Sequence, residues 1–178
     1  MKIKSTPLID LYVINEPTFK DERGVFVKFF NSDVFLQHGL NCNFKEGFYS
    51  VSNRNVIRGM HFQVSPFDQE KLVRVTHGKI LDVVLDIRNE SKTYGKYYSI
   101  VLSSKNYKAL YIPKGFAHGF CTLSSKAVVE YMVTSTYSKI SDSGIRWDSF
   151  DFDWPIDFPI VSNRDLNFTK FSKLSLEK

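Results

Sequence analysis

Short strand-like segments separated by turn residues run through most of this 178-residue chain, and they restrict what it can fold into. In the segment 81–88, apolar side chains alternate with Asp82, Asp86 and Arg88, which is the period-two pattern of a strand. Further strands are predicted at 71–76, 97–102, 109–112 and 127–137. Many short strands at this spacing predict an all-β sandwich, jelly roll or barrel.

Helical signals are few. Ser32 to Gly39 is predicted to form one short helix, with Ser32 as its N-cap and Gly39 just past its end. A final helix is predicted at 168–176, and the stretch 147–159, rich in Asp, Phe, Trp and Pro, is expected to be an ordered loop. No linker interrupts the chain, so residues 1–178 are expected to form a single domain.

Composition excludes several classes of protein. The chain is 43% hydrophobic and 24% charged, which is typical of a globular protein. It has no apolar run of the roughly 20 residues that a membrane span needs, and no secretory signal, so no membrane partner is expected. Cys42 and Cys121 stand apart, which fits the reducing cytoplasm. The net charge of +5 comes from scattered lysines, so a small anionic ligand is favoured over nucleic acid.

Two segments carry histidines, each of which can be a base, a metal ligand or a pH switch near neutral pH. His61 lies in the segment Arg58-Gly59-Met60-His61-Phe62-Gln63. His118 lies in the segment Pro113 to Phe120, which is expected to turn and re-enter a strand. This pair of motifs resembles the cupin pattern, in which metal-binding members usually carry His-x-His and a Glu. Here Gln63 replaces the second His and Glu70 lies seven residues further on, so no bound metal is expected.

A wider set of motifs appears in order along the chain. They are Asp21–Phe26, Val56–Gln63, Glu70–Val75, Gly78–Arg88, Ile112–Phe120, Tyr131 and Gly144–Trp147. From about Leu11 to about Phe168, the chain resembles the dTDP-4-dehydrorhamnose 3,5-epimerase family. The resemblance implies a cupin-type double-stranded β-helix, that is, a jelly-roll barrel with a few short helices. It also implies a cofactor-independent epimerase that acts at C3, C5 or both on a nucleoside diphosphate 4-keto-6-deoxy sugar, in the biosynthesis of surface polysaccharide sugars.

The chemistry of a 4-keto sugar explains which side chains such an enzyme needs. The C–H bonds at C3 and C5 are acidic because the carbanion delocalises onto the C4 oxygen as an enolate. Epimerisation therefore needs a base on one face, an acid on the other and a cation near that oxygen. By resemblance, His61 is the base, Asp165 orients it, Tyr131 is the acid and Lys71 holds the enolate oxygen. Tyr137, six residues past Tyr131, is expected on the same face of that strand.

The remaining predicted site residues would hold the substrate. Arg23 and Arg58 are candidates for the pyrophosphate, because guanidinium groups bind such oxygens in bidentate fashion. Phe26 is a candidate for stacking on the base or the sugar, and His118 is expected to contact the sugar. Further substrate contacts are predicted for Glu46, Tyr137, Asp142 and Arg164. In the family, the segment around Arg23 and Phe26 crosses a dimer interface, so the resemblance implies a homodimer with exchanged N-terminal strands.

Some positions depart from the family pattern. Glu46 and Phe48 replace the Gln and Asn of a Gln-x-Asn-x-Ser run, Lys28 stands where many members have Glu, and Asp142 stands where a Glu usually occurs. These positions surround the substrate, so the nucleotide (dTDP, GDP or CDP) and the sugar (hexose or heptose) stay open. The alternatives are a GDP- or CDP-linked epimerase acting at C3 or C5 only, a sugar-nucleotide 3,4-ketoisomerase, a non-catalytic sugar-nucleotide-binding cupin and a metal-dependent cupin enzyme.

Overall fold

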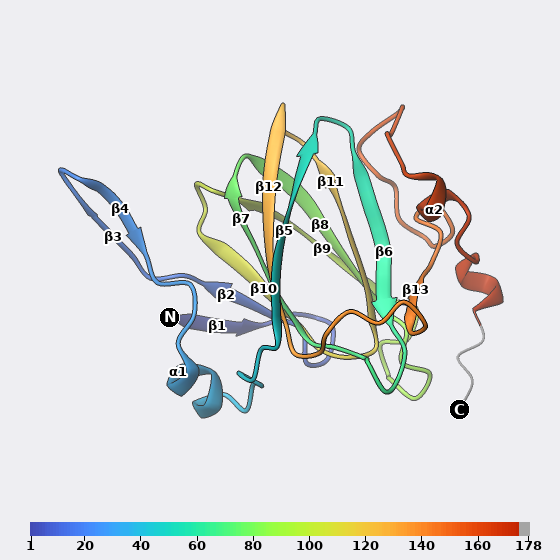
Figure 1. Cartoon of the computed structure of the whole chain (residues 1–178), viewed down its shortest axis with the longest axis horizontal. Helices are drawn as coiled ribbons and strands as arrows, with labels where there is room; N and C mark the ends of the chain where they lie inside the picture. Colours follow the sequence, from blue (N-terminus) through green and yellow to red (C-terminus); the bar gives the residue numbers. More distant parts are fainter. Residues whose placement is uncertain (175–178) are drawn as a thin grey trace.

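The computed structural model describes residues 1–174 and consists mainly of antiparallel strands in two facing sheets (Figure 1). In sheet order, the six-stranded sheet contains β1 (Lys2–Ser5), β2 (Tyr12–Asn15), β10 (Lys108–Ile112), β7 (Lys71–His77), β12 (Lys126–Val133) and β5 (Glu46–Asn53). The five-stranded sheet contains β13 (Asp142–Gly144), β6 (Ile57–Gln63), β11 (Phe116–Thr122), β8 (Lys79–Asp86) and β9 (Tyr97–Ser103). The prediction of an all-β fold is confirmed.

The inner faces of the two sheets share one hydrophobic core. Successive side chains of a strand point to opposite faces, so every second residue of each strand enters this space. The six-stranded sheet contributes Val73, Val75 and Val129, and the five-stranded sheet contributes Ile80, Val84 and Phe120, all buried. This core fills part of the space between the sheets, and the cavity described below occupies another part of it.

Strand β8 is buried on both faces. Its inner face carries Ile80 and Val84, while Val83 and Leu85 on the outer face are fully buried beneath another part of the chain. That cover comes from the segment 147–159, whose aromatic side chains, Phe150, Phe152 and Trp154, pack on this outer cluster. The predicted ordered loop is thus the outer layer of the five-stranded sheet.

Helix α1 (Ser32–Gln37) lies on the outer face of the six-stranded sheet, where Phe35 is fully buried. The predicted N-cap at Ser32 is wrong by one residue. Asn31 caps the helix, because its side-chain oxygen accepts a hydrogen bond from Val34 N at 3.1 Å. Gly39 follows the helix with φ +69°, a conformation that glycine adopts without strain, as predicted.

The C-terminal helix prediction is wrong within the described residues. Only a 3-10 turn, η1 (Phe171–Lys173), forms there, and residues 175 and 176 lie outside the described part. Instead, α2 (Asn163–Leu166) forms earlier, because Ser162 accepts a hydrogen bond from Asp165 N and caps its first turn. Among residues 1–174, no helix has the length and apolar character required to cross a membrane.

The long strand predicted at 127–137 ends early. Strand β12 stops at Val133, so Tyr137 lies in the loop that follows and does not share a strand face with Tyr131. Its position is set by a hydrogen bond of 2.9 Å from Tyr137 N to Glu46 Oε2, on the neighbouring strand β5.

A two-stranded hairpin, β3 (Thr18–Asp21) and β4 (Gly24–Val27), stands away from the two sheets. Figure 1 shows it in blue as an arm that projects from the body of the molecule. Its side chains are largely exposed, including Phe19 and Phe26, whose rings lie 6.1 Å apart between centroids.

Candidate active site

A cavity of about 350 Å³ lies between the sheets, walled by β5, β6, β7, β11 and β12. Most of the predicted site residues line it, namely Glu46, Arg58, His61, Lys71, His118, Tyr131, Tyr137, Asp142 and Arg164. Asp165 lies immediately behind the wall, in contact with His61. The structure therefore brings together ten of the twelve predicted side chains, while Arg23 and Phe26 lie elsewhere.

His61 and Asp165 form a hydrogen-bonded pair at the cavity wall. The distance between His61 Nε2 and Asp165 Oδ1 is 2.9 Å, and Gly59 N donates to Asp165 Oδ2 at 3.0 Å. The His61 side chain is 31% exposed, whereas that of Asp165 is 5% exposed. The carboxylate is therefore held by His61 and Gly59, while Ser162 holds the backbone of Asp165, and it orients an imidazole that still reaches the cavity.

Two glycines allow the strand that carries His61 to sit this deep. A Cβ atom on Gly59, which has φ +138°, would lie 2.5 Å from Gly119 Cα on β11. A Cβ on Gly119 would in turn lie 2.8 Å from Arg58 O. Only residues without a side chain permit this approach, which brings His61 and His118 into register as Cα partners.

Burial and charge set the protonation of this pair. Burial lowers the pKa of His61 below its ordinary value, and this outweighs the hydrogen bond to Asp165, which acts to raise it. Burial acts to raise the pKa of Asp165, but its hydrogen bonds with His61, Gly59 and Ser162 together lower it. The pair therefore consists of a neutral imidazole and a carboxylate at neutral pH, which is the form that a base requires.

Lys71 stands beside His61 on β7. Its side chain is buried, and Nζ donates to His61 O at 3.1 Å. Burial lowers the pKa of Lys71 to about 8, although the charges of Asp82 and Asp142 act in the opposite direction. A lysine with such a pKa remains mostly cationic near pH 7 and can hold a developing oxyanion in a dry cavity.

Tyr131 faces the cavity from β12 and is held by other rings. Phe48 stacks on it with 4.7 Å between centroids and 17° between planes, and His118 approaches edge-on at 6.1 Å. Burial raises the pKa of Tyr131 well above its ordinary value, so the phenol stays protonated. The predicted acid is therefore in the form that donates a proton.

His118 belongs to a second histidine–carboxylate pair, which is deeper. Its Nε2 lies 2.9 Å from Asp82 Oδ2, and the side chains of His118 and Asp82 are 4% and 0% exposed. Asp82 was not among the predicted site residues. The signal was present, because Asp82 shares a period-two face with Ile80 and Val84, and a carboxylate on a buried strand face needs a partner.

The mouth of the cavity is lined by a polar network. Arg164 pairs with Asp142 Oδ2 at 2.6 Å, and the Tyr137 hydroxyl donates to the same oxygen at 3.3 Å. Glu46 holds the backbone of Tyr137, as described above. Arg58 is positioned by a hydrogen bond of 2.9 Å from its Nε to a serine of β5. Arg58, Tyr137 and Arg164 are the exposed members of this network.

Arg23 and Phe26 are not near this cavity within the chain. Both belong to the projecting hairpin, where Arg23 pairs with Asp21 at 2.6 Å and is 91% exposed. Phe26 is 62% exposed and packs only loosely on the other hairpin phenylalanine. The two predicted substrate contacts are therefore absent from the cavity of this chain.

Gln63 has a structural task that explains its place in the histidine motif. Its amide donates to Phe67 O at 2.8 Å and to Thr136 O at 3.2 Å, and it accepts from Ser138 N at 2.7 Å. The side chain thus ties two loops together beside the cavity. Within residues 1–174, no three His, Cys, Asp or Glu side chains gather in the manner of metal ligands.

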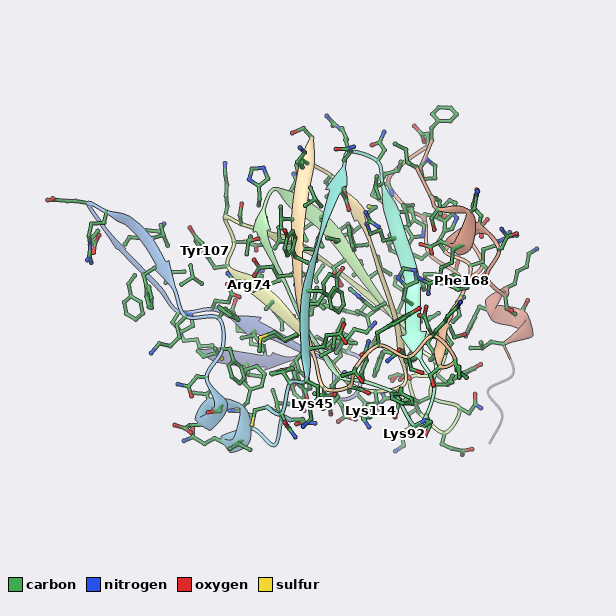
Figure 2. All side chains as sticks on the ribbon, in the orientation of Figure 1. Lys45, Arg74, Lys92, Tyr107, Lys114 and Phe168 are labelled. Carbon is green, nitrogen blue, oxygen red and sulfur yellow. The ribbon has the colours of Figure 1, made fainter. Side chains whose placement is uncertain are left out.

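Two further side chains at the site were not predicted. Ser50 Oγ is buried in the cavity wall and has no hydrogen-bond partner within the described part of the chain. Phe168 meets the His61 ring edge-on at 5.7 Å, and Figure 2 shows it beside β6 and β13. The sequence carried no local signal for either contact, because each depends on how distant segments meet.

Two facing antiparallel sheets around a cavity with an acid–base constellation define a cupin-type jelly roll. Residues 5–173 match the family model described as dTDP-4-dehydrorhamnose 3,5-epimerase. The chain is similar to the dTDP-4-dehydrorhamnose 3,5-epimerase of Shigella flexneri, with 40% identity over 96% of each chain. It is also similar to that of Methanothermobacter thermautotrophicus, with 42% identity over 92% of this chain and 90% of the relative. The chain belongs to the dTDP-4-dehydrorhamnose 3,5-epimerase family.

A solved structure supports the same assignment of fold. The dTDP-6-deoxy-D-glucose-3,5-epimerase of Legionella pneumophila, in complex with dTDP-4-keto-L-rhamnose, superposes with a TM-score of 0.93. It is 33% identical, and the match covers 98% of this chain and 94% of that one. The predicted family and the predicted cupin jelly roll are confirmed.

Proposed function

We propose that this protein is a dTDP-4-dehydrorhamnose 3,5-epimerase, which inverts C3 and C5 of a dTDP-linked 4-keto-6-deoxy sugar. The observation that carries this proposal is the His61–Asp165 pair at the cavity wall, with Lys71 and Tyr131 lining the same cavity. Membership in the family supports the nucleotide and the sugar. The reaction is part of the synthesis of an activated deoxy sugar for surface polysaccharides.

The first half of the proposed reaction removes a proton. Neutral His61 takes the proton from C3 or C5, and the C–H electron pair moves into the ring while the C4 carbonyl becomes an enolate. The ammonium group of Lys71 stabilises the negative charge on the C4 oxygen. Asp165 stabilises the imidazolium that His61 becomes and holds its ring in place, as a carboxylate does in other histidine bases.

The second half returns a proton to the opposite face. Tyr131 donates its phenolic proton to the carbanion carbon, the carbonyl re-forms at C4, and the configuration at that carbon is inverted. His61 loses its proton to solvent and Tyr131 recovers one, which restores the starting state. The raised pKa of Tyr131 supports this assignment because it keeps the phenol protonated before the reaction.

The substrate is proposed to bind with its sugar inside and its diphosphate at the mouth. Arg58 and Arg164 line that mouth and supply the positive charge that phosphate oxygens require. His118 forms the inner wall near the sugar. Asp142 and Glu46 hold the loop that carries Tyr137, which supports a role in shaping the nucleotide pocket.

The proposal is tested with a panel of dTDP-, GDP- and CDP-linked 4-keto sugars incubated in D2O and followed by NMR. The expected result is deuterium at C3 and C5 of the dTDP-linked sugar and inversion at both carbons. Exchange with a GDP- or CDP-linked sugar only, or at one carbon only, would assign one of the alternative epimerases. A product with its carbonyl moved to C3 would identify a ketoisomerase, and no exchange with any member would contradict the enzymatic proposal.

Tyr131→Phe separates the two halves of the reaction. This variant keeps the ring stacked on Phe48 but removes the proton donor. It should retain wash-in of deuterium by His61 and lose inversion by at least about 100-fold. Equal inversion by the variant and the parent would show that another group is the acid.

We also propose a homodimer in which the β3–β4 hairpin of each copy reaches the cavity of its partner. The projection of the hairpin and the exposure of Phe19, Val25 and Phe26 support this arrangement. In it, Arg23 and Phe26 of one copy contact the nucleotide bound by the other, which accounts for their absence from the cavity of their own chain.

Mixing two weakened chains tests this exchange. Arg23→Ala lacks the hairpin cation and His61→Asn lacks the base, so each homodimer should be poorly active. If they are unfolded together and refolded in equal amounts, half of the dimers are mixed and one of two sites in each is intact. Activity should then recover to about a quarter of the parent value. Dimers that form but recover nothing would show that the hairpin serves its own chain.

The remaining proposal is a cytoplasmic location. Cys42 and Cys121 are both free thiols, and Cys121 is buried in β11, which fits a reducing compartment. Cell fractionation with a tagged full-length chain tests this, and recovery from the periplasmic or extracellular fraction would contradict it.

A further inference from the structure

Phe168 lies between two residues of the proposed site. Its ring and the His61 imidazole lie 5.7 Å apart between centroids with 73° between planes, an edge-to-face geometry. The Arg164 guanidinium lies over its face, 5.1 Å from the centroid, as a cation does over an aromatic ring. One aromatic side chain thus contacts both the proposed base, His61, and Arg164, which is proposed to bind the diphosphate.

The backbone next to Phe168 pairs with the residues that directly follow β13. Thr169 forms a parallel bridge with Ile145, and Arg146 N donates to Thr169 O at 3.0 Å. On β13, Gly144 leaves the space that the ring occupies, because any Cβ there would overlap the Phe168 ring. Gly144 is also the Cα partner of His61, so the ring fills the position beside the base where a side chain would otherwise stand.

We propose that Phe168 is a positioning residue, which holds the His61 ring against Asp165, shields it from water and fixes Arg164 at the mouth of the cavity. This inference rests on the proposed function, in which His61 is the base and Arg164 a substrate ligand. Its physical content is separate, because it concerns the orientation and hydration of His61 whether or not a given sugar is the substrate.

The groups around His61 determine what loss of this ring does. Burial is the largest influence and disfavours the imidazolium, Lys71 on β7 and Arg164 on α2 act in the same direction, and Asp165 on α2 opposes them. His118 faces the same cavity from β11. Phe168 contributes to the burial without carrying a charge. Its removal therefore admits water to the imidazole and releases Arg164, and both changes raise the pKa of His61.

The test compares Phe168→Ala and Phe168→Leu with the parent in the full-length chain. Phe168→Ala should move the acid limb of the pH profile of kcat/KM to higher pH and lower kcat for deuterium exchange by about tenfold, as a small misplacement of a catalytic group does. Phe168→Leu keeps an apolar cover but no aromatic face for Arg164. It should leave the acid limb in place while KM rises severalfold.

The pKa of His61 is also measured directly, by NMR titration of the imidazole signal that His61→Asn removes. An upward shift of the His61 pKa in Phe168→Ala supports the inference even if no sugar nucleotide is turned over. If the parent protein catalyses no deuterium exchange, that result contradicts only the proposed function. A folded Phe168→Ala protein with the parent pKa and the parent exchange rate overturns the inference. Phe158→Ala, at a position 86% exposed, is the matched control and should change neither.

Gly144→Ala disturbs the contact between Phe168 and His61 by filling the space that the Phe168 ring occupies. The added methyl group forces the Phe168 ring out of its place, so exchange should fall about as much as in Phe168→Ala. If the damage acts through the ring, Gly144→Ala should cost little more in a Phe168→Ala background. Losses that multiply in the double variant would show that Gly144 and Phe168 act independently, and would overturn this link.

Discussion

The barrel contains two histidine–carboxylate pairs on neighbouring strands, and they differ in access. His61 and His118 are Cα partners across β6 and β11, and each imidazole Nε2 lies 2.9 Å from a carboxylate oxygen. However, the side chain of His61 is 31% exposed and that of His118 only 4%. The carboxylate partners also differ in origin, because Asp165 comes from α2, while Asp82 comes from the adjacent strand β8.

This difference in access indicates a different role for each pair. A base must reach its substrate, so the pair that opens to the cavity is the one suited to proton transfer. The buried pair has both partners inside one sheet, where it fixes β11 to β8 and supports the ring of Tyr131. We therefore propose that the same two residue types serve catalysis in one place and positioning in the other, according to how deeply each pair is buried.

The largest expected effect separates the two histidines. His61→Asn should reduce deuterium exchange by about 1,000-fold, because it removes the proposed base. His118→Asn should reduce exchange only about tenfold while lowering stability, because the buried Asp82 loses its partner. Solvent exchange and urea unfolding of both variants measure this. Equal losses of exchange would remove the distinction.

The two carboxylates provide the next contrast. Asp165→Asn should lower exchange about 100-fold, because the His61 ring loses its orienting acceptor, and should lower stability less than Asp82→Asn, because its partner His61 reaches solvent. Asp82→Asn should lower the free energy of unfolding by about 2–3 kcal/mol, the cost of disturbing a fully buried charged hydrogen bond. Denaturant titration with activity assays on the same samples measures both. The reverse order of stabilities would contradict this assignment of roles.

The pH profile is expected to report the His61–Asp165 pair and Lys71. His61 must be neutral, and its lowered pKa keeps it so as pH falls below 6.5, where an ordinary histidine becomes protonated. Lys71 must be cationic, so kcat/KM should fall as pH rises through about 8. Lys71→Arg should move this alkaline limb to higher pH, because arginine stays charged. His118→Asn serves as the control, and a limb that moves with it would implicate the buried pair.

The smallest expected effect concerns the support of Asp165. Ser162→Ala removes the cap of α2 and should lower stability by about 1 kcal/mol, with a severalfold loss of exchange as Asp165 loosens. The buried pair has no comparable dependence on a helix, because both partners are held by strand ladders. Ser172→Ala, at an exposed position after α2, is the matched control. A change as large in the control would point to a general effect on the C-terminal segment.

Much of the fold followed from local patterns. Strands β7, β8, β9 and β10 lie within one or two residues of their predicted positions because period-two alternation and turn residues are local properties. The end of β12 was misplaced because the residues after it are held by distant segments, with Thr134 N donating to Glu70 O and Tyr137 N to Glu46 Oε2. The cap of α1 was placed one residue late because Asn31 and Ser32 are both good caps and only geometry distinguishes them.

Only part of the site could be predicted from the sequence. Family motifs identified His61, Lys71 and Tyr131, which the structure brings to one cavity. Asp82 escaped because its partner is 36 residues away, and Phe168 escaped because its contacts depend on how the chain after α2 meets β13. Contacts between distant segments carry no local periodicity, so resemblance supplied what pattern alone did not.

Strand β5 is the last strand of its sheet and contacts one neighbouring strand, β12, within the described residues. Its inward side chains at positions 46, 48 and 50 line the cavity, whereas the strands that carry the two histidines are locked together by the contact between Gly59 and Gly119. Replacements on an edge strand disturb fewer neighbours than replacements in the middle of a sheet. Strand β5 is therefore the part of the cavity wall where substitutions can change substrate preference while the strands that carry His61 and His118 stay unchanged.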